Sequence, residues 1–295
     1  MPNYPIMEMV CLFLLYPLDQ GKSRKNTSPA GFETNKKEGY AMQTIRKFLS
    51  CAVGCFLVLP VAYAGTEDPI HDFSANVSFT TEYLFRGVTQ TKEGPAIQGG
   101  FDYTHTPSGF YLGTWASNVT FKTAKNIDDP AVEMDFYGGI AGELGNGVSW
   151  DVGGIYYHYL GQDKDAAGDY DCLEVYGGLG YTFADSALKP AVGAKLSYSD
   201  DYFGEDGNSL YSEGSLGLSL PRDFGLGFHL GFSDVEGGKT SPKGYDYLHG
   251  SVALSRKIAD FDVNLTYHGV IDEDDCPGGD KDPCKAVVFK VSRGF

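Results

Sequence analysis

The sequence predicts an all-β fold, a single up-and-down antiparallel transmembrane β-barrel of about twelve strands. Polar and apolar residues alternate with period two in about twelve segments, most of them about ten to fifteen residues long. Strands of globular proteins usually have about five or six residues, whereas a tilted strand needs about ten to cross a bilayer. Short and long connections also alternate between the segments, as they do in outer-membrane barrels.

The alternation defines each expected strand. In the segment that begins at Phe261, for example, Phe261, Val263 and Leu265 alternate with polar residues. Such a strand has one apolar and one polar face. The expected strands cover residues 72–87, 96–106, 110–121, 131–144, 148–160, 170–183, 187–201, 209–220, 225–234, 244–258, 261–271 and 285–295.

The connections predict how the strands are ordered. After every second strand the link is short, as in 107–109 and 145–147, and the other links are longer and polar, as in 122–130 and 272–284. All short turns then lie at one end of the barrel, and an even number of strands lets the first and last strands pair antiparallel. Closure removes the sheet edge, whose backbone groups lipid could not satisfy.

The last expected strand carries a separate indication of the same fold. Phe289, Val291 and Phe295 belong to one apolar row, and the chain ends on Phe295. A terminal aromatic residue on an alternating final strand is the usual membrane-insertion signal of outer-membrane barrels. Aromatic residues near strand ends fit interfacial girdles, namely Phe73, Tyr83, Phe85, Phe121, Tyr181, Phe183 and Tyr267. The alternative is a soluble β-sandwich or a water-soluble barrel with an apolar interior.

The N-terminal region has the three parts of a secretory signal peptide over residues 42–64. Arg46 and Lys47 precede an apolar run from 48 to 61, and a small-x-small sequence ends at Ala64. We expect cleavage between Ala64 and Gly65, which leaves residues 65–295 as the barrel; an uncleaved membrane anchor is the alternative. Residues 1–41 form an extension before this signal, and we interpret Met42 as the natural start of the chain.

The net charge excludes one class of partner. The chain has 39 acidic and 23 basic residues and a net charge of −16, so it lacks the basic surface that nucleic-acid binding needs. Residues 1–64 contain seven basic and four acidic residues, and their removal deepens the net charge to −19. Hydrophobic residues make up 42% of the sequence, which argues against a disordered acidic chain.

Three cysteines remain after residue 64. Cys276 and Cys284 are close in sequence and are candidates for a disulfide across a loop in an oxidising compartment, with Cys172 left over.

Several stretches resemble the proteobacterial Gcw-type conserved exported-protein family, whose members carry the label TorF-type porin. They are 73–77, 81–90 (Thr-Glu-Tyr-Leu-Phe-Arg-Gly-Val-Thr-Gln), 95–100, 108–118, 133–137 and 174–178. The resemblance covers nearly all of 65–295 and implies an outer-membrane protein of a Gram-negative bacterium. It implies no substrate, because none is established for the family, and it does not extend to residues 1–41 or to the loop with Cys276 and Cys284.

If the apolar rows face lipid, the other rows face the lumen and supply candidate pore-lining residues. These are Glu82, Arg86, Asp102, Glu133, Asp135, Asp151, Glu174, Lys195, Glu213, Asp262 and Lys290. Acids exceed bases, so a water-filled lumen would favour cations, and we expect a channel for passive diffusion of small solutes. The alternative is that Arg86 and Lys195 pair with opposite acids inside a filled, non-conducting barrel that acts through its acidic external loops.

The sequence predicts no enzyme, no cofactor and no metal site. No histidine has a nucleophile and an orienting group at a spacing typical of a catalytic triad. The acidic loops match no EF-hand pattern, although oxygen-rich loops can bind hard cations. The expected partners are outer-membrane lipid, lipopolysaccharide, the barrel-assembly machinery and small solutes.

Overall fold

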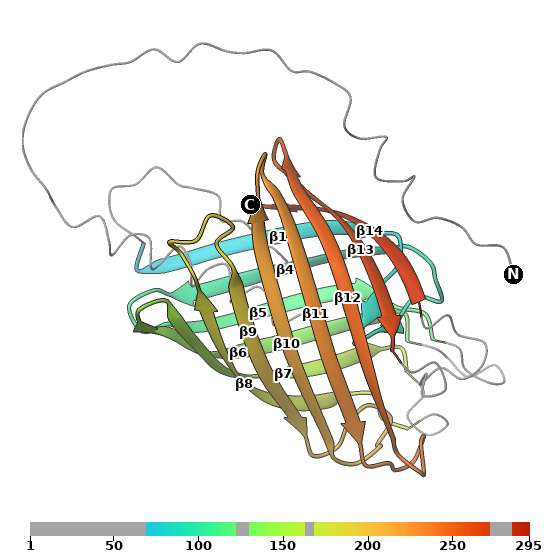
Figure 1. The fold of residues 1–295 in the computed structure, drawn as a ribbon. Helices are drawn as coiled ribbons and strands as arrows, with labels where there is room; N and C mark the ends of the chain where they lie inside the picture. The colour runs from blue at the N-terminus through green and yellow to red at the C-terminus, as the bar shows by residue number, and fades with distance from the viewer. Residues whose placement is uncertain (1–68, 122–129, 163–167, 272–284) are drawn as a thin grey trace, which may run out of the picture. The chain divides into compact units, whose positions relative to one another are not determined.

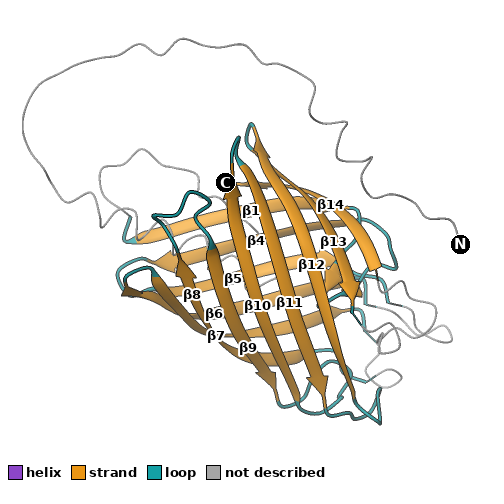
Figure 2. Cartoon of the chain, in the orientation of Figure 1, coloured by secondary structure: helices purple, strands orange, loops and turns teal. Residues whose placement is uncertain are grey.

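A computed structural model describes residues 69–121, 130–162, 168–271 and 285–295. Strands, turns and loops make up these residues (Figures 1 and 2). Within them, no helix has the length and apolar character to cross a membrane. The predicted extension 1–41, the predicted signal peptide 42–64, the expected cleavage at Ala64–Gly65 and the candidate pair Cys276 and Cys284 all lie outside the described residues.

Twelve long strands form a closed barrel in which each strand pairs antiparallel with its neighbours in the chain and β14 pairs with β1. The predicted architecture and strand number are therefore confirmed. The strands are β1 (His71–Thr80), β4 (Ala96–His105), β5 (Phe110–Asn118), β6 (Val132–Gly145), β7 (Val148–Leu160), β8 (Cys172–Thr182), β9 (Ala191–Ser199), β10 (Ser209–Leu220), β11 (Phe224–Val235), β12 (Tyr245–Ile258), β13 (Phe261–Val270) and β14 (Lys285–Gly294).

The two ends of the barrel differ in their connections. The links 106–109, 146–147, 183–190, 221–223 and 259–260 lie at one end, which we call the turn end. At the other end, which we call the loop end, the chain passes from β1 to β4, from β5 to β6, from β7 to β8, from β9 to β10, from β11 to β12 and from β13 to β14. The predicted alternation of short and long links is thus present along the whole barrel.

The outer surface of the barrel is apolar. Ile97, Leu179 and Val287 are 68%, 61% and 62% exposed, and each alternates with a residue on the inner face. Ten-residue strands at the usual tilt span about 25 Å, the height of the apolar band of an outer-membrane barrel. A closed wall with an apolar exterior and polar interior rows satisfies every backbone group without water. The protein is a transmembrane barrel of the outer-membrane type.

The first expected strand, 72–87, is wrong in its second half. β1 ends at Thr80, and residues 81–95, which we call the inner hairpin, leave the wall and form the two short strands β2 (Leu84–Phe85) and β3 (Val88–Thr89). Arg86 and Gly87 make the turn with φ values of 49° and 83°. Period two persists through the hairpin because its strands are also extended, so alternation alone did not show where the wall ends.

Three residues assigned to the interfacial girdles are placed differently, and those assignments were wrong. Tyr83 is buried, Phe85 packs edge-on against Tyr157 at 5.6 Å between ring centroids, and Phe121 packs against Tyr159 at 5.7 Å. All three follow the point at which their strand leaves the wall, so their side chains join an internal aromatic cluster. Phe73, Phe183 and Tyr267, by contrast, are exposed on the outside.

Candidate functional site in the barrel lumen

The inner hairpin reaches across the lumen. Tyr83 donates a hydrogen bond to Glu133 on β6 (2.9 Å) and its ring meets Trp115 on β5 edge-on, with 5.5 Å between centroids. At the tip, a Cβ on Gly87 would lie 3.0 Å from the Cβ of His249 on β12. The hairpin starts at β1 and contacts strands on the opposite wall, so it narrows the lumen near the loop end.

Arg86 at the hairpin tip is the central cation of this region. Its guanidinium donates to Glu174 on β8 at 2.8 Å and to the Tyr202 hydroxyl at 3.3 Å. The same group lies 4.0 Å from the ring centroid of Tyr211 and 4.8 Å from that of Phe85. The side chains of Arg86 and Glu174 are 7% and 2% exposed, so the ion pair is shielded from solvent and from salt.

Two further carboxylates lie on β6, which is separated from β8 by β7. Glu133 and Asp135 on β6 are 1% and 0% exposed. Within the described part of the chain, neither oxygen of Asp135 has a hydrogen-bond partner, and one oxygen each of Glu133 and Glu174 also lacks one. Trp115 and Tyr157 are the cross-strand partners of Asp135. The region therefore combines three buried carboxylates, one guanidinium and several aromatic rings.

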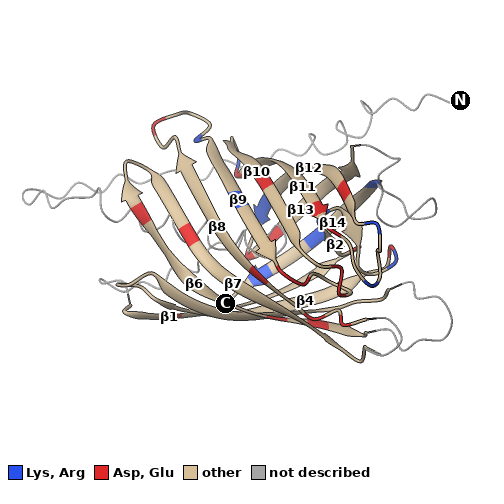
Figure 3. Cartoon of the chain, turned by 90° about the horizontal axis from the view of Figure 1, so that it is seen from below, with Lys and Arg blue, Asp and Glu red and all other residues tan. Residues whose placement is uncertain are grey.

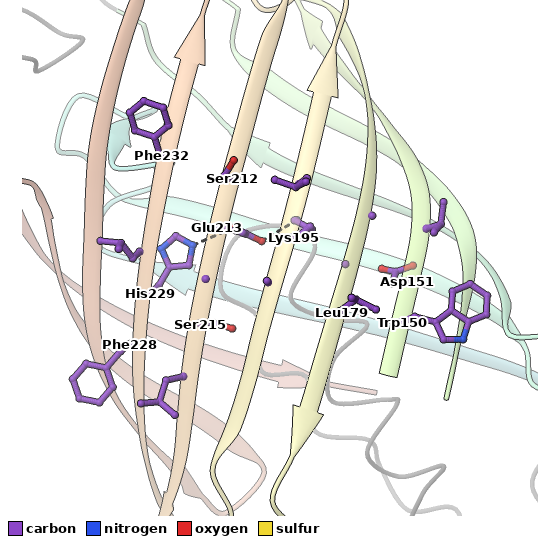
Figure 4. A pocket seen from close by; sticks show the side chains of 18 of the residues that line it. Trp150, Asp151, Leu179, Lys195, Ser212, Glu213, Ser215, Phe228, His229 and Phe232 are labelled. Atoms are coloured by element: carbon purple, nitrogen blue, oxygen red, sulfur yellow. Dashed lines mark hydrogen bonds and ion pairs between the residues drawn. The ribbon is translucent and has the colours of Figure 1, made fainter. Parts of the chain in front are cut away.

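A second polar group lies on β9 to β12, nearer the middle of the barrel. Lys195 pairs with Glu213 at 3.2 Å and His229 with the same carboxylate at 3.1 Å (Figure 4). His229 and His249 lie 5.4 Å apart between ring centroids, and Tyr211 and His249 form a 2.9 Å hydrogen bond. Polar contacts thus continue from Arg86, through Tyr211, to His249 on β12.

Towards the turn end, tyrosines donate hydrogen bonds to two further carboxylates. Tyr137 donates to Asp102 at 2.5 Å and Tyr111 donates to Asp151 at 2.7 Å. The Tyr111 and Tyr176 hydroxyls are 2.6 Å apart. Glycines make this possible: a Cβ on Gly153 would lie 2.6 Å from the Tyr176 hydroxyl.

The other predicted pore-lining residues are separate from these groups. Glu82 was expected in the first membrane strand. It belongs instead to the inner hairpin and is 8% exposed. Lys290 on β14 donates to Gln98 on β4 at 2.9 Å. Asp262 on β13 lies opposite Lys257 at the turn end. Figure 3 shows acidic and basic residues interspersed along the strands of the barrel.

The tyrosines around the Arg86 guanidinium could not be recognised from the sequence. Tyr202 follows β9 in a loop, and Tyr211 occupies an inner position of β10, where a lone tyrosine gives no specific signal. One usable signal was present: Gly87 follows Arg86 within the expected first strand, and glycine in a strand indicates a turn, a bulge or a close backbone approach.

A hollow of about 1010 Å³ lies over strands β7 to β12. Most of its lining residues, such as Leu179, Leu196 and Phe228, belong to the outward rows and are more than a third exposed. Small outward residues, among them Gly177 and Gly214, form the hollow. Its lining also includes the inward residues Lys195, Glu213 and His229 of the second polar group (Figure 4).

Over the residues with a described structure, no group of three or more His, Cys, Asp or Glu side chains is arranged to hold a metal ion. The acidic loop residue Glu205 is paired with Lys239 at 2.6 Å, and Asp206 accepts hydrogen bonds from Thr240 and Ser241.

Residues 64–278 match the family model Gcw_chp, described as a bacterial protein of unknown function. The chain belongs to this family. A search of curated proteins gives no sequence match. Similar solved structures include the KdgM porin (TM-score 0.49, 9% identity, 75% of this chain and 98% of that one) and the NanC porin (0.47, 10%, 76% and 99%). The COG4313 outer membrane channel from Pseudomonas putida F1 has a TM-score of 0.47 at 10% identity, over 80% of this chain and 100% of that one.

Proposed function

We propose that the protein is an outer-membrane channel for passive diffusion of small solutes, with an acidic lumen that favours cations. The observation that carries this proposal is the charge on the inner positions. Eight carboxylates and three basic side chains occupy the eleven predicted positions, and two of the carboxylates are ion-paired with these bases. The carboxylates that have no ion-pair partner outnumber the remaining basic side chain. The low-dielectric wall around them strengthens their effect on a passing ion.

The inner hairpin defines the narrowest section in this proposal. Three buried carboxylates, Glu133, Asp135 and Glu174, lie there with a single guanidinium from Arg86. Acidic side chains outnumber the one guanidinium at this section, so a cation finds more groups that can pair with it than an anion does. The selectivity of the channel is therefore set at the hairpin and not at the turn end.

Current measurements in planar bilayers test the proposal. With purified protein under a potassium chloride gradient, we expect discrete channels whose reversal potential has the sign of cation preference. Anion preference would contradict the acidic-lumen proposal, and complete silence at every salt concentration and voltage would contradict the channel.

One observation favours a second candidate. The inner hairpin and the aromatic cluster around Tyr159, Tyr170 and Phe203 occupy the loop end of the lumen. A barrel filled in this way suits a non-conducting structural or surface-binding protein that acts through its acidic external loops. Silent bilayers, together with normal folding in detergent, would favour this candidate.

The proposal includes the route to the membrane and the partners met there. Export by the signal peptide at 42–64 is followed by recognition of β14 by the barrel-assembly machinery, through Phe289, Val291 and Phe295, of which Phe289 and Phe295 are exposed. Outer-membrane lipid and lipopolysaccharide then surround the apolar wall. Deletion of Phe295 should lower the amount of heat-modifiable barrel in the outer membrane, and an unchanged amount would remove this residue from the signal.

A further inference from the structure

Arg86 shows how this lumen binds a cation. Its guanidinium is held by one carboxylate, from Glu174, and by the faces of Tyr202 and Tyr211. Carboxylates and aromatic faces are the two groups that recognise guanidinium and ammonium ions in proteins. We call these three residues the cation cage.

Arg86 is not an integral part of the barrel wall. It lies at the tip of a hairpin whose strands have only two paired positions, Leu84 with Thr89 and Phe85 with Val88. Its φ of 49° is in the left-handed region, which costs a non-glycine residue free energy and persists only where other contacts compensate. The contacts made in the cage therefore hold the hairpin tip in place.

The carboxylates around the cage are not balanced by Arg86 alone. Asp135 is fully buried and, among the residues described, neither of its oxygens is hydrogen-bonded. A buried carboxyl group without a partner is costly to ionise and holds a proton unless a cationic group lies close to it. A cation bound beside Asp135 would supply that partner. The site can thus accommodate more positive charge than Arg86 supplies.

We propose that the cation cage and Asp135 form a binding site for the guanidinium or primary ammonium group of a small solute, and that Arg86 is the tethered occupant that this solute displaces. The inference deepens the proposed function, because it names the solute class. Anions find no carboxylate with which they can pair, and neutral solutes can form hydrogen bonds to the carboxylates but no ion pair. Displacement of Arg86 withdraws the hairpin tip and frees the narrow section.

Trp115 gives a direct readout of this event. It is packed against Tyr83 of the inner hairpin and lies opposite Asp135 in the sheet register. The chain has two tryptophans, and Trp150→Phe on the outer wall leaves Trp115 as the sole reporter. The folded barrel in detergent is titrated with agmatine, which carries both cationic groups, at constant ionic strength.

We expect a saturable change in Trp115 fluorescence, and Arg86→Ala should strengthen agmatine binding about tenfold or more because the competitor is gone. An affinity that is unchanged or weaker in Arg86→Ala would overturn the competition. Arg86→Gln, which keeps hydrogen-bonding capacity but no charge, is the second variant if the alanine variant does not fold, with the same expected direction.

Matched variants test the acidic half of the site. Asp135→Asn should weaken agmatine binding about tenfold, as expected for loss of a charge-assisted contact. Asp102→Asn removes the same charge from a carboxylate already bonded to Tyr137 and should bind like the parent. Equal losses in both variants, or an equal fluorescence response to sodium chloride, would show general screening and overturn the site. Saturable agmatine binding without conductance would contradict the channel but not this inference. Conductance without saturable agmatine binding would contradict this inference but not the channel.

Discussion

The loop end and the turn end of the lumen are enclosed by the same strands but hold different contents. On β11 the inner residues Ser233 and Val235 near the loop end are each 2% exposed, whereas His229 and the inner glycines towards the turn end are only half-buried. β12 shows the same change, from buried Tyr247 to exposed Lys257. One end is a packed core and the other is a polar vestibule.

The difference follows from the connections. Four of the five turn-end links have two to four residues and can only join neighbouring strands; only 183–190 is longer, with eight. These links leave the vestibule open. The long links at the loop end can fold back, and 81–95 and 200–208 bring Tyr83, Tyr202 and Phe203 into the lumen. The wall decides which residues face inwards, and the long loops decide whether the space they face is filled.

Removing the inner hairpin tests this comparison most strongly. β1 and β4 are adjacent and pair at Thr80 and Ala96, so Gly-Ser-Gly in place of residues 82–94 can join them. We expect unitary conductance in planar bilayers to rise several-fold, because the obstruction near the loop end is gone. Shortening the turn-end link at 184–189 is the control and should leave conductance unchanged. A barrel that stays closed without the hairpin would show that other loops fill the lumen.

The aromatic packing of the loop end should dominate stability. Tyr170 is 7% exposed and stacks on Phe203 with 4.5 Å between centroids. Tyr170→Ala should lower the free energy of unfolding by about 3 kcal/mol or more, as expected for deletion of a buried aromatic side chain. Leu188→Ala, at a turn-end position that is 41% exposed, should change it by about 0.5 kcal/mol or less. Urea unfolding in detergent measures both, and equal effects would mean that the two ends are not packed differently.

The barrel wall could be predicted almost completely from the sequence. Each wall strand except the first agrees with its predicted range to within four residues, because a membrane barrel enforces period two on every strand that faces lipid. Asp102 and Asp151 lie on the inner rows for the same reason. The ion pair of Lys195 with Glu213, which belonged to the alternative prediction, is also present.

The contents of the lumen could not be predicted in the same way. Arg86 meets Glu174 across 88 residues of sequence, and no local pattern links them. Tyr83 and Phe85 look like girdle residues because the hairpin continues the alternation of β1. Their placement depends on a turn at Arg86 and Gly87, which period two does not reveal.

Glycines in the middle of the barrel mark where the packed end gives way to the vestibule. A Cβ on Gly153 would lie 2.6 Å and 2.7 Å from the hydroxyls of Tyr176 and Tyr111, whereas a Cβ on its neighbour Gly154 would lie 3.4 Å from a backbone oxygen. Gly153→Ala should cost about 1–3 kcal/mol of unfolding free energy through overpacking, and Gly154→Ala, the matched control, should cost less. Identical unfolding midpoints in urea for the two variants would argue that the tyrosine pair is not fixed.

The smallest effect is expected where the loops meet water. Lys239 donates to Glu205 at 2.6 Å, and this contact, with the backbone N–H of Asp169, holds the pKa of Glu205 below its usual value of 4.5. An acid whose pKa is lowered by folding stabilises the folded state above its unfolded pKa and loses that contribution as the pH falls through the folded pKa. Lys239→Met should therefore destabilise the barrel slightly at pH 7, and the difference from the parent should vanish well below pH 4.5. Lys243→Met, in the same loop, changes the net charge equally and should show no such pH dependence in unfolding experiments; a matching dependence would mean that net charge, and not this contact, is responsible.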